Sequence, residues 1–157
     1  MHFPYNKNKI FASKIWLIGR SYAAAIERTK TGKSLNTIID DFWTELEPGQ
    51  QWLDESLQAL NQTPIDDMKG KLDIIFKIHN EFTEIMKKTT NLEKRSLSSK
   101  YLHFHCPNAF FIYDSRARKS INKLVGGKKV TNYTGDAEYI GFYLKVLELQ
   151  NFFKQKT

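Results

Sequence analysis

The sequence has very little cysteine, since Cys106 is the only one among 157 residues. A single thiol excludes a disulfide framework, a cysteine-based zinc finger and an iron–sulfur cluster held by this chain alone. Long apolar runs are also missing, because none approaches the ~18–20 residues that a membrane span needs. The basic N-terminus is not followed by the apolar block of a signal peptide. We therefore expect a cytoplasmic protein with no membrane partner.

The residues that are plentiful are typical of one globular domain. The length suits a single helical domain over residues 1–157, and 11 Phe, 7 Tyr and 3 Trp argue against disorder. Apolar residues recur mainly at spacings of three, four and seven, which favours helices. We predict an all-α domain of six or seven helices over 9–29, 34–46, 49–60, 63–88, 95–105, 115–124 and 136–154, with a break at Pro48-Gly49 and an extended segment at 109–114.

Charge is distributed unevenly along the chain. The net charge of +7 combines an acidic segment, residues 33–86, with a strongly basic one, residues 87–129. The basic segment holds eleven Lys and Arg residues against two acids, Glu93 and Asp114. Such clustering is typical of a surface that binds a polyanion, and nucleic acid is the partner it favours. A solvated helical surface is the simpler interpretation of the same pattern.

Asp114 is the only carboxylate between Glu93 and Asp136, and arginines follow it closely. It directly precedes the helix predicted from residue 115, so capping that helix or forming an ion pair is its simplest role. The functional alternative is a carboxylate held at a helix start inside a basic cleft. There it would stabilise developing positive charge or activate a water molecule.

His103, His105 and Cys106, together with Asp114, supply the atom types that bind zinc. Their spacing matches no finger pattern, and residues two apart on a helix point in different directions. We therefore expect no metal and no cofactor.

The stretch that leads to Asp114 resembles part of the helix-hairpin-helix DNA glycosylase superfamily. The resembling features are Arg95-Ser96, a short helix, Pro107, the apolar run FFIY, and Asp114 at the start of a new helix. The resemblance implies a reduced glycosylase-like core with Asp114 as the catalytic aspartate. Ser96 lies 18 residues earlier, where bifunctional members carry a lysine and monofunctional adenine glycosylases can have serine. A monofunctional base-excision activity on DNA follows from the resemblance.

The prediction for function is a nucleic-acid-binding protein, with duplex DNA as partner, that hydrolyses an N-glycosidic bond using Asp114 and Ser96. The residues predicted to bind the phosphate backbone of the nucleic acid are Lys94, Arg95, Lys100, Arg116, Arg118, Lys119, Lys128 and Lys129. Tyr101 and Tyr113 are candidates to stack on a flipped base, beside His103 and His105. Arg20 and Glu27, seven residues apart on one helix face, are candidates for a polar pocket wall.

Two other interpretations of the sequence remain open. The scaffold and its basic surface could serve a binding module that catalyses nothing. Alternatively, the acidic segment of one copy could meet the basic segment of another, which would give a salt-sensitive homo-oligomer.

Overall fold

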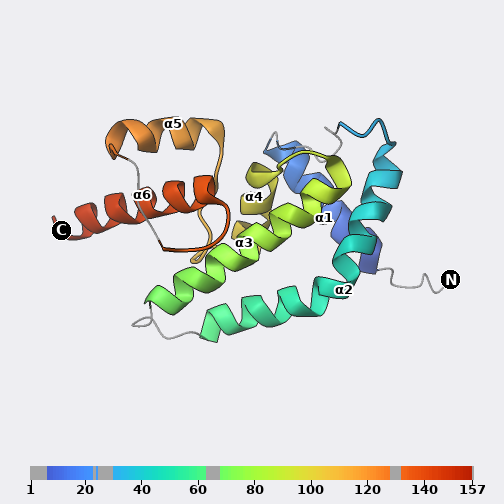
Figure 1. Ribbon diagram of the computed structural model, residues 1–157, viewed down its shortest axis with the longest axis horizontal. Helices are drawn as coiled ribbons and strands as arrows, with labels where there is room; N and C mark the ends of the chain where they lie inside the picture. The colour runs from blue at the N-terminus through green and yellow to red at the C-terminus, as the bar shows by residue number, and fades with distance from the viewer. Residues whose placement is uncertain (1–6, 23, 25–29, 63–67, 128–131, 157) are drawn as a thin grey trace.

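The computed structural model describes residues 7–22, 24, 30–62, 68–127 and 132–156. Six helices lie within these residues, and no strand is found there: α1 (Lys7–Ser21), α2 (Leu35–Gln62), α3 (Met68–Thr90), α4 (Arg95–His105), α5 (Ser115–Leu124) and α6 (Ala137–Lys154) (Figure 1). The prediction of an all-α protein is confirmed. None of the described helices is both long and apolar enough to cross a membrane.

The longest helices, α2 and α3, pack side by side (Figure 1). The predicted break at Pro48-Gly49 is wrong, because α2 runs without interruption from Leu35 to Gln62. Ile38, Phe42, Leu53 and Leu60 are all buried, and their spacings of four, eleven and seven place them on one helix face. Burial of that continuous stripe outweighs the ~3 kcal/mol that an interior proline typically costs. Ser34 begins the helix as predicted, and its Oγ accepts from the Thr37 N–H at 3.3 Å.

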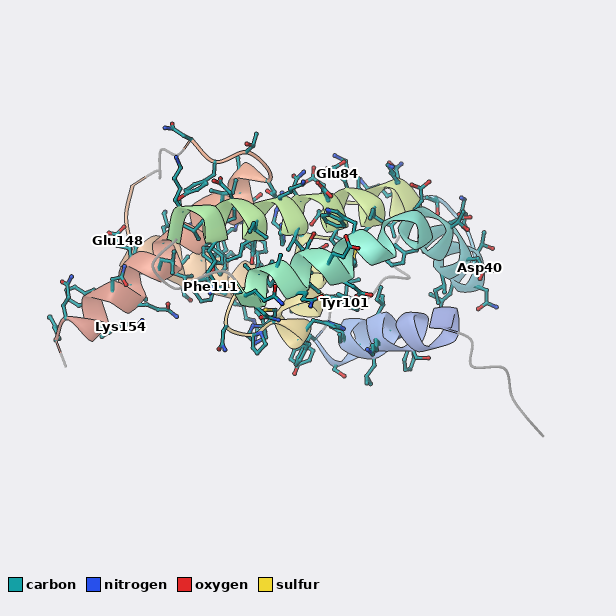
Figure 2. All side chains as sticks on the ribbon, turned by 90° about the horizontal axis from the view of Figure 1, so that it is seen from below. Asp40, Glu84, Tyr101, Phe111, Glu148 and Lys154 are labelled. Atoms are coloured by element: carbon teal, nitrogen blue, oxygen red, sulfur yellow. The ribbon has the colours of Figure 1, made fainter. Side chains whose placement is uncertain are left out.

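Aromatic side chains of α6 join it to α3 and to the extended segment before α5. The His79 and Tyr139 rings stack 3.5 Å apart, and the Phe76 ring meets the Tyr143 ring edge-on at 5.3 Å. The hydroxyl groups of Tyr139 and Tyr143 donate to the carbonyl oxygens of Phe111 and Ala109. Residues 110–114 are therefore held in place although they form neither helix nor strand. Phe111 and Tyr101 lie within the body, whereas Asp40, Glu84, Glu148 and Lys154 lie on its outside (Figure 2).

The helix predicted over 9–29 corresponds to α1, which ends at Ser21, and residues 23 and 25–29 of the predicted range lie outside the described residues. Its end is closed by the Ala24 N–H, which donates to the Gly19 carbonyl oxygen at 2.8 Å, a bond of the kind that ends many helices. The Tyr22 carbonyl oxygen then accepts from the Lys100 ammonium group of α4 at 2.9 Å. The chain thus leaves the helix where it meets α4. The helix predicted over 63–88 corresponds to α3, and its predicted first residues, 63–67, lie outside the described residues.

Three helix N-termini converge on one side of the molecule. Asp114 caps α5, Asp136 caps α6, and the first residue of α4, Arg95, forms an ion pair with Asp136. Both caps follow the sequence pattern of an acid directly before a helix. Because helix N-termini carry partial positive charge, their convergence favours anions.

Candidate active site

A pocket of about 610 Å³ opens where these N-termini converge. Its walls come from Tyr22 just after α1, from the N-terminal halves of α4 and α5, from the residues before α5 and from the start of α6. The lining residues are Tyr22, Glu93, Arg95, Ser96, Lys100, Tyr113, Asp114, Ser115, Arg116, Arg118 and Glu138. Seven of these were predicted as site residues, among them both predicted catalytic residues, Ser96 and Asp114.

Asp114 is held rigidly on the pocket wall. Its Oδ1 accepts from the backbone N–H groups of Arg116 and Ala117, both at 2.8 Å. The same oxygen makes both bonds, so Oδ2 is left free of them. The capping role predicted for Asp114 is confirmed, and it uses only one of the two carboxylate oxygens.

Arg95 is the centre of an ion-pair network and is itself only 16% exposed. Its Nε pairs with Asp136, and its two terminal nitrogens lie 3.1 Å from Glu93 and 3.1 Å from Glu138. The hydrogen bond and charge of Arg95 hold the pKa of Asp136 below its usual value, against the opposing effect of burial. Three carboxylates therefore already neutralise this guanidinium. Arg95 joins α4 to α6 and is not an available cation for phosphate.

Glu138 connects the network to α5. It accepts from the Tyr113 hydroxyl group and from Arg118 at 2.8 Å. The hydrogen bond from Tyr113 is the main reason that the pKa of Glu138 lies below its usual value, with Arg95 and Arg118 adding to it. Burial and this carboxylate raise the pKa of Tyr113 to about 12. Arg118 is thus also paired, although more exposed than Arg95.

Lys100 is almost buried, with 4% of its surface exposed. Its Nζ lies 2.9 Å from the Tyr22 carbonyl oxygen and 3.0 Å from Ser96 Oγ, one helical turn earlier on α4. Burial lowers the pKa of Lys100, and the charge of Asp114 offsets part of that effect. Ser99 fixes the wall behind this pair, since its Oγ donates to the Ser96 carbonyl oxygen and accepts from the Tyr113 N–H.

Arg116 differs from the other pocket arginines. Its side chain is exposed, and within the described residues it forms no ion pair. Arg116 is consequently the cation at the pocket mouth that can bind an anionic ligand without giving up an existing partner.

Tyr101, His103 and His105 were predicted in the pocket, and the structure places all three elsewhere. Tyr101 is buried, with its ring 5.0 Å from that of Phe82 and 4.3 Å from that of His105. A residue five or nine positions after Ser96 faces the opposite side of the helix. His103 shares the face of Ser96 but lies ~10 Å further along α4. There its Nδ1 pairs with the Phe110 carbonyl oxygen.

Other predicted site residues also lie away from the pocket walls. Arg20 is on the exposed side of α1, with its guanidinium 5.7 Å from the centre of the Trp16 ring. Lys94 occupies the N-cap position of α4, and Lys119 is exposed on α5. Glu27, Lys128 and Lys129 lie outside the described residues.

Sequence reasoning missed four pocket residues: Tyr22, Glu93, Ser115 and Glu138. Asp136, which pairs with Arg95 behind the pocket wall, was missed as well. The sequence position of Asp136 could have identified it, because Asp136 stands at the start of a predicted helix just as Asp114 does. The pairing of Arg95 with residues about forty positions away has no local signal.

A metal site is not evident in the part of the chain that the structure describes, where no group of three or more His, Cys, Asp or Glu side chains is placed to hold an ion. Comparisons of the chain with protein-family models, with curated proteins and with solved structures find no match.

Proposed function

We propose that this protein binds nucleic acid at the pocket and hydrolyses an N-glycosidic bond, with Asp114 as the catalytic carboxylate. The observation that carries the proposal is the placement of Asp114. Its Oδ1 is fixed by two backbone N–H groups, and its Oδ2 is left to act on the wall of a pocket that also holds Lys100 and Arg116. A preorganised carboxylate is what stabilisation of a positively charged sugar requires.

In the proposed reaction the bond between base and sugar breaks first, and positive charge develops on the sugar ring. Asp114 Oδ2 stabilises that charge or orients the water that attacks the anomeric carbon. Its backbone partners hold the carboxylate in one geometry, so little reorganisation is needed as charge develops.

Binding is assigned to Arg116 and the helix N-termini, which attract the phosphate backbone. A flipped base also needs an aromatic surface, since flipping costs a few kcal/mol. Tyr22 fits this role better than the predicted Tyr101 or Tyr113. It lines the pocket and is 45% exposed, whereas Tyr113 is 7% exposed and lies against Arg95.

Asp114→Asn is expected to lower base release at least ~100-fold, the usual minimum for loss of a catalytic acid or base. Asparagine caps helices as well as aspartate does, so the bonds to Arg116 and Ala117 survive while the charge is lost. The measurement is alkali-induced strand breakage in duplex oligonucleotides that each carry one modified base. Asp73→Asn, a change of an exposed residue on α3, serves as the matched control and should leave base release unchanged.

Fluorescence anisotropy against plain duplex, single-stranded and abasic duplex DNA, titrated with salt, separates this function from its rivals. The proposal expects salt-sensitive binding that is tightest for abasic duplex and persists in Asp114→Asn. Equal binding to all three, with no base released from any substrate, would instead indicate a non-catalytic module. A complete lack of binding at low salt would overturn both, and salt-dependent sedimentation would then test self-association.

A further inference from the structure

We propose that Ser96 and Lys100 form a nucleophile–base pair that hydrolyses small esters carrying an anionic group. This activity goes beyond the proposed function, because it uses Ser96 Oγ as a covalent nucleophile and needs no nucleic acid. It rests on the geometry of α4 and on the pocket that both side chains line.

The two reactive atoms are already in contact. Ser96 Oγ lies 3.0 Å from Lys100 Nζ, within the distance that proton transfer requires. Because the residues are four apart on α4, the helix itself keeps them on one face. The nucleophile lies in the first turn and the lysine one turn later. A similar arrangement, with the lysine three residues after the serine, serves serine acyl-transfer enzymes.

The surroundings of Lys100 suit a base. Burial lowers its pKa, which increases the fraction of neutral amine near pH 7. In the structure Lys100 Nζ donates to the Tyr22 carbonyl oxygen and to Ser96 Oγ. Once deprotonated, the amine keeps an N–H for Tyr22 and has a lone pair that faces Ser96 Oγ and takes the hydroxyl proton. Asp114 then stabilises the ammonium ion that results, because its charge favours the protonated lysine.

The start of α4 offers donors for the oxyanion. Lys94, at the N-cap position, makes no side-chain capping bond, in contrast to Asp114 and Asp136 on α5 and α6. The backbone N–H groups of the first helical turn, which include those of Ser96 and Leu97, have no acceptor inside the helix. Such N–H groups stabilise the negative oxygen of a tetrahedral intermediate.

The reaction proceeds in two balanced steps. Ser96 Oγ attacks the ester carbonyl carbon while its proton moves to Lys100 Nζ, and collapse of the intermediate breaks the carbon–oxygen bond to the alcohol, which takes that proton. Water then attacks the acyl-serine and gives its proton to Lys100, and the proton returns to Ser96 as the acid leaves. Arg116 selects an anionic group on the substrate, because it is the exposed pocket cation without an ion pair in the described structure.

Reaction with a fluorophosphonate probe tests the pair directly. The probe should add once per chain at Ser96, with release of fluoride, as read from intact mass and peptide mapping. Ser96→Ala should abolish the adduct, whereas Ser120→Ala, at an exposed serine of α5 outside the pocket, should not change it. Lys100→Met should slow labelling at least ~100-fold, as loss of a general base does. Circular dichroism confirms that each variant is folded.

Two further measurements keep the proposal open to refutation if Lys100→Met does not fold. The labelling rate of the wild-type protein should rise with pH, with a midpoint below the ordinary lysine value of 10.5, since the Lys100 amine must be neutral and its pKa is lowered. Arg116→Ala should reduce hydrolysis of the 4-nitrophenyl monoester of glutaric acid about tenfold relative to 4-nitrophenyl acetate, equivalent to ~1.4 kcal/mol. Absence of an adduct, or an adduct that persists in Ser96→Ala, would overturn the pair. Neither assay contains nucleic acid, so such a failure says nothing against base release.

Discussion

Lowering the pH from 7 to 4 is expected to reduce the free energy of unfolding of the wild-type protein by about 3 kcal/mol more than that of His79→Leu. The cause is a histidine that the fold keeps neutral. Burial lowers the pKa of His79 from 6.5 to about 3, and the charge of Asp136 offsets only part of this. The unfolded chain therefore binds a proton as the pH falls through 6.5, whereas the folded chain does not until about pH 3. Stability is present at neutral pH and is lost across this range.

The structure explains why His79 resists protonation. Its side chain is fully buried, and neither ring nitrogen has a hydrogen-bond partner among the described residues. One ring face stacks on Tyr139 at 3.5 Å, and the nearest charges are those of the Arg95–Asp136 pair. A proton added here must lose its hydration, and that cost exceeds what the charge of Asp136 and a backbone interaction with Arg95 return.

Urea unfolding of both proteins at pH 7 and pH 4 measures the effect. Leucine has nearly the volume of histidine, and any constant packing change cancels because only the pH difference is compared. The Asp136 carboxylate also titrates in acid. Because it is present in both proteins, its contribution cancels when the two stability losses are compared. Equal losses in wild type and His79→Leu would show that another group is responsible.

Local sequence patterns predict where the helices of this protein begin better than they predict how long each helix is. Asp114 and Asp136 each precede a helix, and both cap it as expected. Pro48-Gly49 predicts a break in the helix when only neighbouring residues are considered. It is tolerated because Ile38, Phe42, Leu53 and Leu60 share one buried face across it. The apolar stripe can be identified in the sequence. Whether its burial stabilises the helix by more than the interior proline costs depends on α3, which packs along it.

The candidate site was predictable where its residues lie close together in the sequence. Ser96, Lys100 and Asp114 lie close in sequence, and the structure brings them to one pocket. Tyr101 was misplaced because composition does not reveal which helix face turns inward. Apart from Glu93, the ion-pair partners of Arg95 and Arg118 lie 20 to 43 residues away, so counting charges along the sequence overstated the positive charge available to a ligand. Arg116, which stays exposed, is indistinguishable from them in the sequence.

Arg95→Ala is expected to lower the free energy of unfolding by about 3–5 kcal/mol at pH 7. The side chains of Arg95 and Asp136 are 16% and 10% exposed, so removal of the guanidinium leaves a largely buried carboxylate without its counter-ion. Glu138 and Glu93 lose a partner at the same time. Urea unfolding followed by circular dichroism measures the change, and an unaltered slope would show that the same cooperative unit unfolds.

Arg118→Ala provides the comparison, because Arg118 pairs with the same Glu138. That ion pair is exposed, with 43% of the Arg118 side chain and 42% of the Glu138 side chain accessible. Exposed pairs contribute ~0–1 kcal/mol, so this variant should remain near wild type. Acid supplies the second control. The pKa of Asp136 is held below 3.8, so the stability it contributes is present above that value and is lost as the pH falls. The gap between Arg95→Ala and wild type should therefore narrow in acid, where protonated Asp136 no longer needs a partner. Equal losses for the two arginine variants, or a gap that does not change with pH, would contradict a central role for the buried Arg95–Asp136 pair.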